Sequence, residues 1–164
     1  MEPPTNPTND PLAQARERLI AFLSTRPRSV EEARERLQRA GFSSTVIEGA
    51  LQDAEERGWL DDAAFAKLWI EDRLMSNPRG PKLLRSELRE KGVDDAQIEE
   101  AIREADIDEA ALVRELVERQ RPRYTHDDPE ARRRKLAAFL QRRGFNYRAI
   151  RDALDEIDRG DPDS

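Results

Sequence analysis

The chain has 164 residues, of which 39% are charged and 37% hydrophobic, and its formal net charge is −6 with a pI near 5.1. This composition gives much surface relative to core, so it favours an array of small units over one compact sphere. The chain lacks cysteine, which excludes disulfides and thiolate metal sites, and no apolar run approaches the ~18 residues of a membrane span, so we expect a soluble, cytoplasmic protein without a membrane partner.

The chain begins with MEPPTNPTNDP, which lacks the basic and apolar regions of a secretory signal peptide. Its prolines predict a disordered N-terminal tail over residues 1–10. Beyond this tail apolar residues recur at helical spacing, and no segment alternates apolar and polar residues between turns as a strand would. The sequence therefore predicts an all-α protein. The expected helices cover residues 11–25, 29–40, 44–57, 61–76, 81–91, 95–105, 107–121, 129–143 and 147–158.

One helical pattern occurs three times, at intervals of 51 and 52 residues. It reads LQRAGFSSTVIEGAL from Leu37, LREKGVDDAQIEEAI from Leu88 and LQRRGFNYRAIRDAL from Leu140. A three-helix unit of this size buries little surface alone, so it gains stability by stacking on a neighbour. We therefore expect three tandem three-helix repeats that form an elongated, curved body. The expected divisions are repeat 1 over residues 11–58, repeat 2 over residues 59–106, repeat 3 over residues 107–158 and an acidic C-terminal tail over residues 159–164.

Local signals predict where several helices begin and end. The segment SVEE, from Ser29, has the form of a capping box. Pro81 follows a glycine and suits the first position of a helix. The glycine of each repeated pattern, at Gly41, Gly92 and Gly144, stands where a left-handed C-terminal cap is needed. The Phe or Val that follows each glycine would then cover the end of the helix with an apolar side chain.

Charge is strongly segregated along the chain. Residues 92–118 carry ten acids and two bases, residues 119–151 carry eleven bases and three acids, and residues 152–164 are acidic again. Such segregation predicts separate charged patches, which matter more for association than the average charge. The acidic stretch is read first as a solvated helix face. The alternative is a negative surface that meets DNA-binding elements of a partner in place of the phosphate backbone.

The aromatic residues near the centre favour core packing over base stacking. Phe65, then Leu68 or Trp69, then Leu74 recur at helical spacing. Trp59 follows a glycine, and a turn there would expose its ring. Aromatic platforms that stack on single strands normally come from sheets, which this sequence does not predict.

The residue types needed for catalysis are scarce. His126 is the only histidine and stands in the turn-like segment YTHDDPE, where a solvated loop residue is expected. Asp61 and Asp62 have the form of a helix cap. The sequence contains no nucleophile elbow, no phosphate-binding loop and no paired histidines. We therefore predict a protein that is not an enzyme and that uses no cofactor and no metal.

A basic stripe on the helix expected from Pro81 is the first candidate binding site. Lys82, Arg85 and Arg89 fall at i, i+3 and i+7, so they share one side of the helix, and Arg79 stands just before it. The aligned helices of the other two repeats do not carry three bases there. The alternative is a solvated helix face in an arginine-rich chain.

A second candidate site lies in ARRRKLAAFLQRR of the third repeat. Arg132, Lys135 and Arg142 form another stripe, which would be a seat for phosphates or for an acidic strip of a partner. Arg133 and Arg143 stand nearer the core face, where packing or carbonyl capping is the alternative. The acidic stretch directly upstream could also neutralise this stripe within the molecule.

The segment GWLDDAAFAKLWIEDRLMSNPRGPKLLRSELREKGV, residues 58–93, resembles the RecX family of recombinase regulators. The segments RPRSVEEARERLQRAGF and ARRRKLAAFLQRRGF resemble the same family, and the similarity extends from about Leu12 to Ile157. The resemblance implies three tandem three-helix repeats that bind in the groove of the RecA–DNA filament. It further implies that the protein blocks filament extension and inhibits ATP hydrolysis, strand exchange and co-protease activity.

On this basis we expect a non-catalytic negative modulator of RecA. Its partners would be the RecA filament and DNA, mainly the single strand within the filament, and we expect a monomer. The alternative is a direct DNA-binding transcriptional regulator built from helix-turn-helix-like pairs, because glycine-containing turns join the paired helices. An acidic pI and the lack of an obvious dimerisation seam argue against that alternative.

Overall fold

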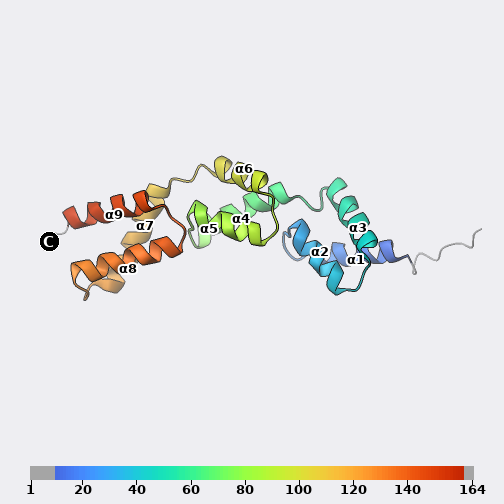
Figure 1. Cartoon of the computed structure of the whole chain (residues 1–164), viewed down its shortest axis with the longest axis horizontal. Helices are drawn as coiled ribbons and strands as arrows, with labels where there is room; N and C mark the ends of the chain where they lie inside the picture. Colours follow the sequence, from blue (N-terminus) through green and yellow to red (C-terminus); the bar gives the residue numbers. More distant parts are fainter. Residues whose placement is uncertain (1–9, 161–164) are drawn as a thin grey trace, which may run out of the picture. The chain divides into compact units, whose positions relative to one another are not determined.

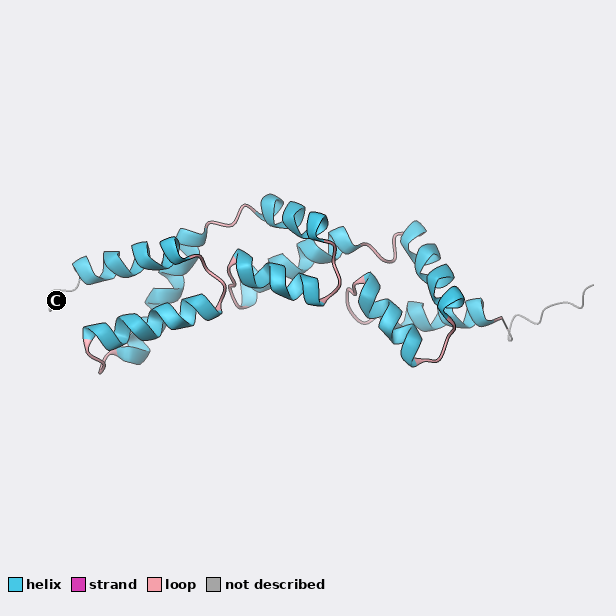
Figure 2. Cartoon of the chain, viewed as in Figure 1, coloured by secondary structure: helices cyan, strands magenta, loops and turns pink. Residues whose placement is uncertain are grey.

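A computed structural model of the chain describes residues 10–160. All regular secondary structure within this range is helical, which confirms the predicted all-α fold of tandem three-helix repeats (Figure 2). None of the helices in this range is long and apolar enough to span a bilayer. The elements are α1 (Pro11–Leu23), α2 (Val30–Arg39), α3 (Ser44–Glu56), α4 (Asp62–Ser76), α5 (Pro81–Glu90), α6 (Asp95–Ala105), α7 (Glu109–Gln120), the 3-10 turn η2 (Arg121–Tyr124), α8 (Pro129–Arg142) and α9 (Tyr147–Gly160).

The predicted tails differ from the structure at their inner ends. Asp10 caps α1, because its Oδ1 accepts the N–H of Leu12 at 3.0 Å. Helix α9 continues to Gly160, so residue 159 belongs to a helix and not to the acidic tail predicted from there. The remaining parts of both predicted tails, residues 1–9 and 161–164, lie outside the described residues.

The predicted helix signals are confirmed at several ends. Ser29 and Glu32 form a complete capping box at the start of α2, and α5 begins at Pro81. Gly41, Gly92 and Gly144 have φ values of 85°, 76° and 81°, which is the left-handed conformation that a glycine cap supplies. After each of these glycines, the next residue donates its N–H to the leucine carbonyl five residues earlier, as in Phe145 to Leu140 at 3.3 Å.

The first repeat packs α1, α2 and α3 around one apolar core (Figure 1). Each helix contributes residues from its buried face, and the start of the following segment closes the core with Leu60. The buried members are Ala15, Leu19, Ala33, Leu37, Ile47, Ala50, Leu51, Ala54 and Leu60. Because these residues recur at helical spacing, burying them fixes which face of each helix turns inward.

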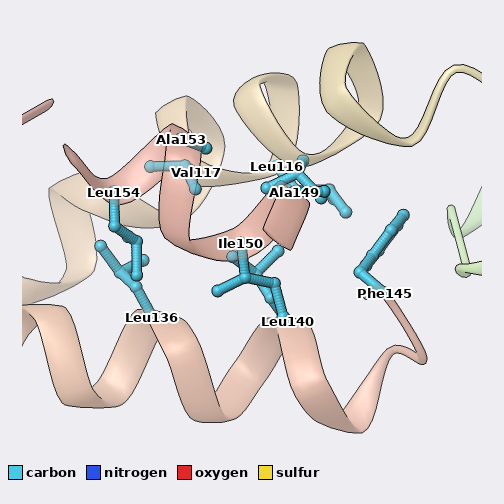
Figure 3. Close-up of a cluster of buried hydrophobic side chains, with 10 residues drawn as sticks. Leu116, Val117, Leu136, Leu140, Phe145, Ala149, Ile150, Ala153 and Leu154 are labelled. Atoms are coloured by element: carbon cyan, nitrogen blue, oxygen red, sulfur yellow. The ribbon is translucent and has the colours of Figure 1, made fainter. Parts of the chain in front are cut away.

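The third repeat repeats this arrangement with α7, α8 and α9. In Figure 3, Leu136 and Leu140 of α8 point toward Leu154 and Ile150 of α9, and α7 closes the core from the other side. Phe145, the residue after the capping glycine, is 4% exposed and belongs to the same cluster. The predicted apolar cover of the helix end is therefore confirmed here.

The described chain divides into two compact units, and the division passes through α4, α5 and α6. The first unit holds residues up to Leu68 together with Leu88–Ile98, and the second holds Trp69–Glu87 together with the residues from Glu99 on. Helices of the second repeat therefore contribute to both units. The second repeat buries Phe65, Ala66, Ile70, Leu84, Leu88, Val93, Ile98 and Ala101.

The aromatic segment matches its prediction only in part. Phe65 is buried, as expected, and of the two alternatives for the next position Leu68 is 49% exposed, whereas Trp69 is the one that turns inward. The neighbouring Ile70 is buried. Trp69 is partly buried and donates from Nε1 to Glu87 Oε2 at 2.9 Å.

In the first unit, the N-terminus of α2 meets the C-terminus of α5. Ser29, which is fully buried, donates from Oγ to the carbonyl of Lys91 at 2.6 Å. Asp62 accepts the N–H of Val30 at 2.9 Å, so this aspartate caps α2 of the preceding repeat. The positive end of one helix thereby faces the negative end of another, which is a favourable arrangement of helix dipoles.

In the second unit, the N-terminus of α5 meets the C-terminus of α8 in the same way. The N–H of Gly80 donates to the carbonyl of Arg143 at 2.7 Å, and that of Lys82 donates to the carbonyl of Gly144 at 3.3 Å. Gly144 lies directly against Leu83, and an added Cβ would overlap its backbone nitrogen. Successive repeats are thus joined by one kind of helix-end contact.

Candidate basic interface

The predicted basic stripe on α5 is paired with acids of α6. Arg85 binds Glu99 with two hydrogen bonds, from Nε at 2.5 Å and from Nη2 at 3.0 Å, and this contact raises the pKa of Arg85 above its ordinary value. Arg89 pairs with Asp95 at 2.7 Å and lies in the first unit, whereas Arg85 lies in the second. Acidic residues 92–118 therefore neutralise part of this stripe.

Lys82 differs from its two neighbours on the stripe. Its side chain is exposed, and within residues 10–160 it makes no ion pair. Arg79 lies apart from the stripe, because its side chain is only 23% exposed and pairs with Glu87 in the second unit. The structure thus brings Lys82 and Arg85 together on α5 and places Arg79 in a separate, half-buried cluster.

That separate cluster contains two arginines that were not predicted as binding residues. Arg73 of α4 lies 3.4 Å from Glu87, and Arg143 at the end of α8 donates to Asn77 Oδ1 and, at 3.3 Å, to the carbonyl of Pro78. Burial, followed by repulsion from Arg73 and Arg143, lowers the pKa of Arg79. The proximity of these three arginines could not be inferred from their positions in the sequence.

The predicted stripe of the third repeat is partly neutralised by nearby acids. Lys135 pairs with Asp127 at 2.8 Å and lies 5.6 Å from the ring centroid of Tyr124. Arg132 is half-buried, and Arg142 is exposed on the last turn of α8. The acid nearest Lys135 comes from the loop before α8, not from the acidic stretch over residues 92–118.

Of the two arginines nearer the core face, only Arg143 caps a carbonyl, whereas Arg133 binds carboxylates. Arg133 forms ion pairs with Asp155 at 2.6 Å and with Asp158, both on α9, and these carboxylates raise its pKa. The acidic partners of Arg133 lie downstream of it and do not belong to the acidic stretch over residues 92–118. Arg143 caps a carbonyl, as the alternative proposed.

One repeated ion pair was missed by the sequence analysis. Arg34 pairs with Glu48 in the first repeat, and Arg85 pairs with Glu99 at the equivalent positions of the second. Each pair joins the second and third helices of its repeat across 14 residues. The recurrence of Arg and Glu at this spacing, one repeat apart, is the signal that could have identified it.

Asp62 is a second feature that the sequence did not reveal. Burial raises the pKa of this carboxyl, although the N–H of Val30 and the charge of Arg34 act in the opposite direction. Asp61, by contrast, caps α4 itself by accepting the N–H of Ala64 at 3.0 Å. The two adjacent aspartates therefore cap two different helices.

His126 is exposed in a turn, as predicted. Among the described residues 10–160, no group of three or more acidic, histidine or cysteine side chains is arranged to hold a metal ion.

All three repeats are similar to domains of known proteins. Family models described as the first, second and third three-helix domains of RecX match residues 15–53, 61–102 and 107–154. A protein named "Regulatory protein RecX" from Prosthecochloris aestuarii is 40% identical over 144 residues, which cover 88% of this chain and 93% of that protein. Another protein of the same name, from Amycolatopsis mediterranei, is 33% identical over 161 residues, which cover 95% of this chain and 92% of that protein.

The fold is also similar to solved structures. The crystal structure of RecX from Lactobacillus salivarius aligns with a TM-score of 0.82, covering 91% of this chain and 97% of that one at 22% identity. A second structure, described as the crystal structure of regulatory protein RecX, aligns with a TM-score of 0.80 at 23% identity. This alignment covers 90% of this chain and 73% of that one. At these identities the likeness concerns the fold.

Proposed function

Since the chain belongs to the RecX family, we propose that it is a cytoplasmic, non-catalytic negative modulator of the RecA recombinase. It binds as a monomer in the groove of the RecA–DNA filament and blocks extension of the filament. ATP hydrolysis, strand exchange and co-protease activity fall as a result. The match of all three repeats to the regulatory family is the observation that carries this proposal.

Lys82 and Arg85 are the residues of α5 that we assign to the contact with the filament. Lys82 is exposed, and the Arg85–Glu99 pair is open to solvent, with 34% and 52% of the two side chains exposed. Exposed ion pairs contribute only about 0–1 kcal/mol, so a phosphate or a partner carboxylate can replace Glu99 at small cost. Basic residues of α8, namely Arg132, Lys135 and Arg142, are assigned to the same binding surface.

The proposed effect on the filament follows from differential affinity. A protein that binds one filament state more tightly than another shifts the population toward that state, and no catalytic residue is needed. A molecule seated at the growing end also excludes the next recombinase subunit. Both effects require contacts with the assembled filament and not with a free subunit alone.

The double change Lys82→Glu/Arg85→Glu tests the contribution of α5. We expect it to abolish inhibition of RecA ATP hydrolysis, because two favourable charges become two repulsive ones, while the circular dichroism spectrum keeps its helical signal. The control is Arg18→Glu/Arg39→Glu, which makes the same change of charge at exposed positions of the first repeat and should inhibit like wild type. Full inhibition by the Lys82 and Arg85 variant would remove these residues from the site.

A direct DNA binder would behave differently in salt. Its affinity for naked DNA would fall with a log–log slope of about −0.7 to −0.9 per contacted phosphate, whether or not recombinase is present. The proposed modulator binds naked DNA weakly and gains affinity when the filament forms. Fluorescence anisotropy with labelled DNA, measured with and without RecA, separates these two behaviours.

A further inference from the structure

In the second unit, two arginines pair with one half-buried carboxylate, and a third arginine lies near them. Arg73 comes from α4, Arg79 from the loop before α5, and Arg143 from the C-terminal cap of α8. Glu87 of α5 pairs with Arg79, lies 3.4 Å from Arg73 Nε, and accepts the Nε1–H of Trp69 at 2.9 Å. Two guanidinium groups therefore share one carboxylate whose side chain is 13% exposed, and the guanidinium of Arg143 lies close enough to Arg79 to repel it.

The positive charge of this cluster is not balanced by the acids around it. Arg143 donates to the side-chain oxygen of Asn77 and to a backbone carbonyl, and neither acceptor carries a charge. No carboxylate within residues 10–160 forms an ion pair with Arg143. Arg73 does pair with Asp72 at 2.8 Å, but that carboxylate is 64% exposed and is screened by water. At least one guanidinium charge therefore remains in excess.

Two of the guanidinium groups are held in place by aromatic rings. Arg73 lies 4.1 Å from the ring centroid of Trp69, and Arg143 lies 4.9 Å from that of Phe139. A stacked guanidinium keeps its planar edge of N–H donors, which matches two oxygens of a phosphate or carboxylate. Because the side chains are already ordered, less conformational entropy would be lost when an anion binds.

A purely structural explanation accounts for only part of the cluster. Arg143 ties the loop before α5 to the end of α8, and one arginine is sufficient for that contact. It does not explain why Arg73 and Arg79 lie beside it, where like charges repel each other. Burial, followed by repulsion from Arg73 and Arg143, lowers the pKa of Arg79. Arg73 Nε is buried and has Glu87 at 3.4 Å without a well-formed hydrogen bond, which is costly. An anion would relieve both penalties.

We propose that Arg73, Arg79 and Arg143 form a binding site for a phosphate group, with Glu87 limiting its affinity. The phosphate can come from the backbone of a single-stranded nucleic acid or from a free anion. A phosphate of the strand inside the filament is the occupant that the proposed function would supply. Binding can be measured without recombinase, so failure of this site and failure of the proposed function are distinguishable.

Trp69 provides the signal for a direct test. The chain has two tryptophans, so the full-length Trp59→Phe protein reports through Trp69 alone, which touches both Arg73 and Glu87. This protein is titrated with a short oligothymidylate and, separately, with inorganic phosphate, against chloride at equal ionic strength. The site predicts a saturable change in Trp69 fluorescence with oligothymidylate.

Two substitutions in this background should act in opposite directions. Arg79→Gln should weaken binding about tenfold or more, as expected for the loss of one charge-assisted hydrogen bond. Glu87→Gln should strengthen it, because a repelling carboxylate is removed while an amide oxygen can still accept from Trp69. Arg39→Gln, which removes one exposed arginine from the first repeat, is the control and should bind unchanged.

The outcomes are distinct. Competition of inorganic phosphate with oligothymidylate supports a site open to free anions, and binding of oligothymidylate alone supports recognition of a strand. Equal affinity of the Arg79→Gln and Arg39→Gln proteins, or no saturable response to either probe, overturns the proposal. If Glu87→Gln proves unfolded by circular dichroism, Arg79→Lys takes its place and should bind with an affinity between those of wild type and Arg79→Gln.

Discussion

Replacing Gly144 by alanine perturbs the contact between α8 and α5 within the second unit. Gly144 has a φ of 81°, and a side chain in this left-handed region costs about 1–2 kcal/mol. An added Cβ would also overlap the backbone nitrogen and Cβ of Leu83, so α5 would have to move. Overpacking of this kind costs about 1–3 kcal/mol. The expected loss of stability is therefore about 2–5 kcal/mol.

Gly41 offers a matched control in the first repeat. It has the same left-handed conformation, with a φ of 85°, but an added Cβ would meet no atom within 4 Å. Gly41→Ala should therefore cost only the conformational part, about 1–2 kcal/mol. Gly92→Ala should fall between the two, because its Cβ would lie 2.5 Å from the Cβ of Glu31, which is a side-chain atom and can shift more easily than backbone.

Urea unfolding followed by circular dichroism measures these differences. A loss of 1 kcal/mol lowers the melting temperature of a protein of this size by about 2–4 °C, so thermal melts give a second measure. We expect the order of destabilisation to be Gly144→Ala, then Gly92→Ala, then Gly41→Ala. Equal losses of stability for Gly41→Ala and Gly144→Ala would show that the overlap with Leu83 costs nothing, since the two variants would then share only the cost of the backbone conformation.

Two further substitutions probe the start of α2. Ser29→Ala removes the hydroxyl that accepts the N–H of Glu32 and donates to the carbonyl of Lys91, so it should lower the free energy of unfolding by about 1–3 kcal/mol. Ser43→Ala, at an exposed helix cap, should lower it by less than about 1 kcal/mol in the same urea titration. Burial opposes ionisation of Glu32, but hydrogen bonds from Arg26, Ser29 and Lys91 outweigh it and lower its pKa. The ionised Glu32 therefore stabilises the folded protein above the ordinary glutamate pKa of about 4.5, and this stabilisation is lost as the pH falls through the lowered pKa. Glu32→Gln should cost about 1–2 kcal/mol at pH 7 and less at pH 3, and an equal cost at both pH values would contradict this assignment.

The fold could be predicted closely because its signals are local. The repeated frame that contains Leu37, Leu88 and Leu140 sets the spacing of buried residues, and all three leucines are fully buried. The glycine after each pattern needs the left-handed conformation whatever surrounds it. Helical periodicity and capping residues act within a few residues of each other, so a single sequence reveals them.

Contacts across the repeats could not be predicted in this way. Asp62 resembles a cap of its own helix, but it caps α2, which precedes it in the chain. Arg73 and Arg143 stand 70 residues apart, and nothing in their local sequence indicates a shared cluster. Leu68 fits the apolar spacing of a core residue yet is exposed, because periodicity gives the face of a helix and not the extent to which neighbours cover it.

The positions of the basic residues on α5 could be predicted from the sequence, but their ion-pair partners could not. Lys82 is exposed as expected, whereas Arg85 and Arg89 have carboxylate partners on α6. A sequence shows that acids exist nearby, but only the fold shows which acid reaches which base. The net positive charge of the surface is therefore smaller than the number of basic residues indicates.

Titration of the protein into preformed RecA filaments on single-stranded DNA, with ATP hydrolysis as the readout, tests whether the protein is a negative modulator of RecA. We predict that hydrolysis falls progressively at amounts well below one molecule per recombinase subunit, because under the proposed function one bound molecule blocks the growing end of a filament. Unchanged hydrolysis, together with salt-sensitive binding of naked DNA, would contradict the account and would favour a direct DNA-binding regulator.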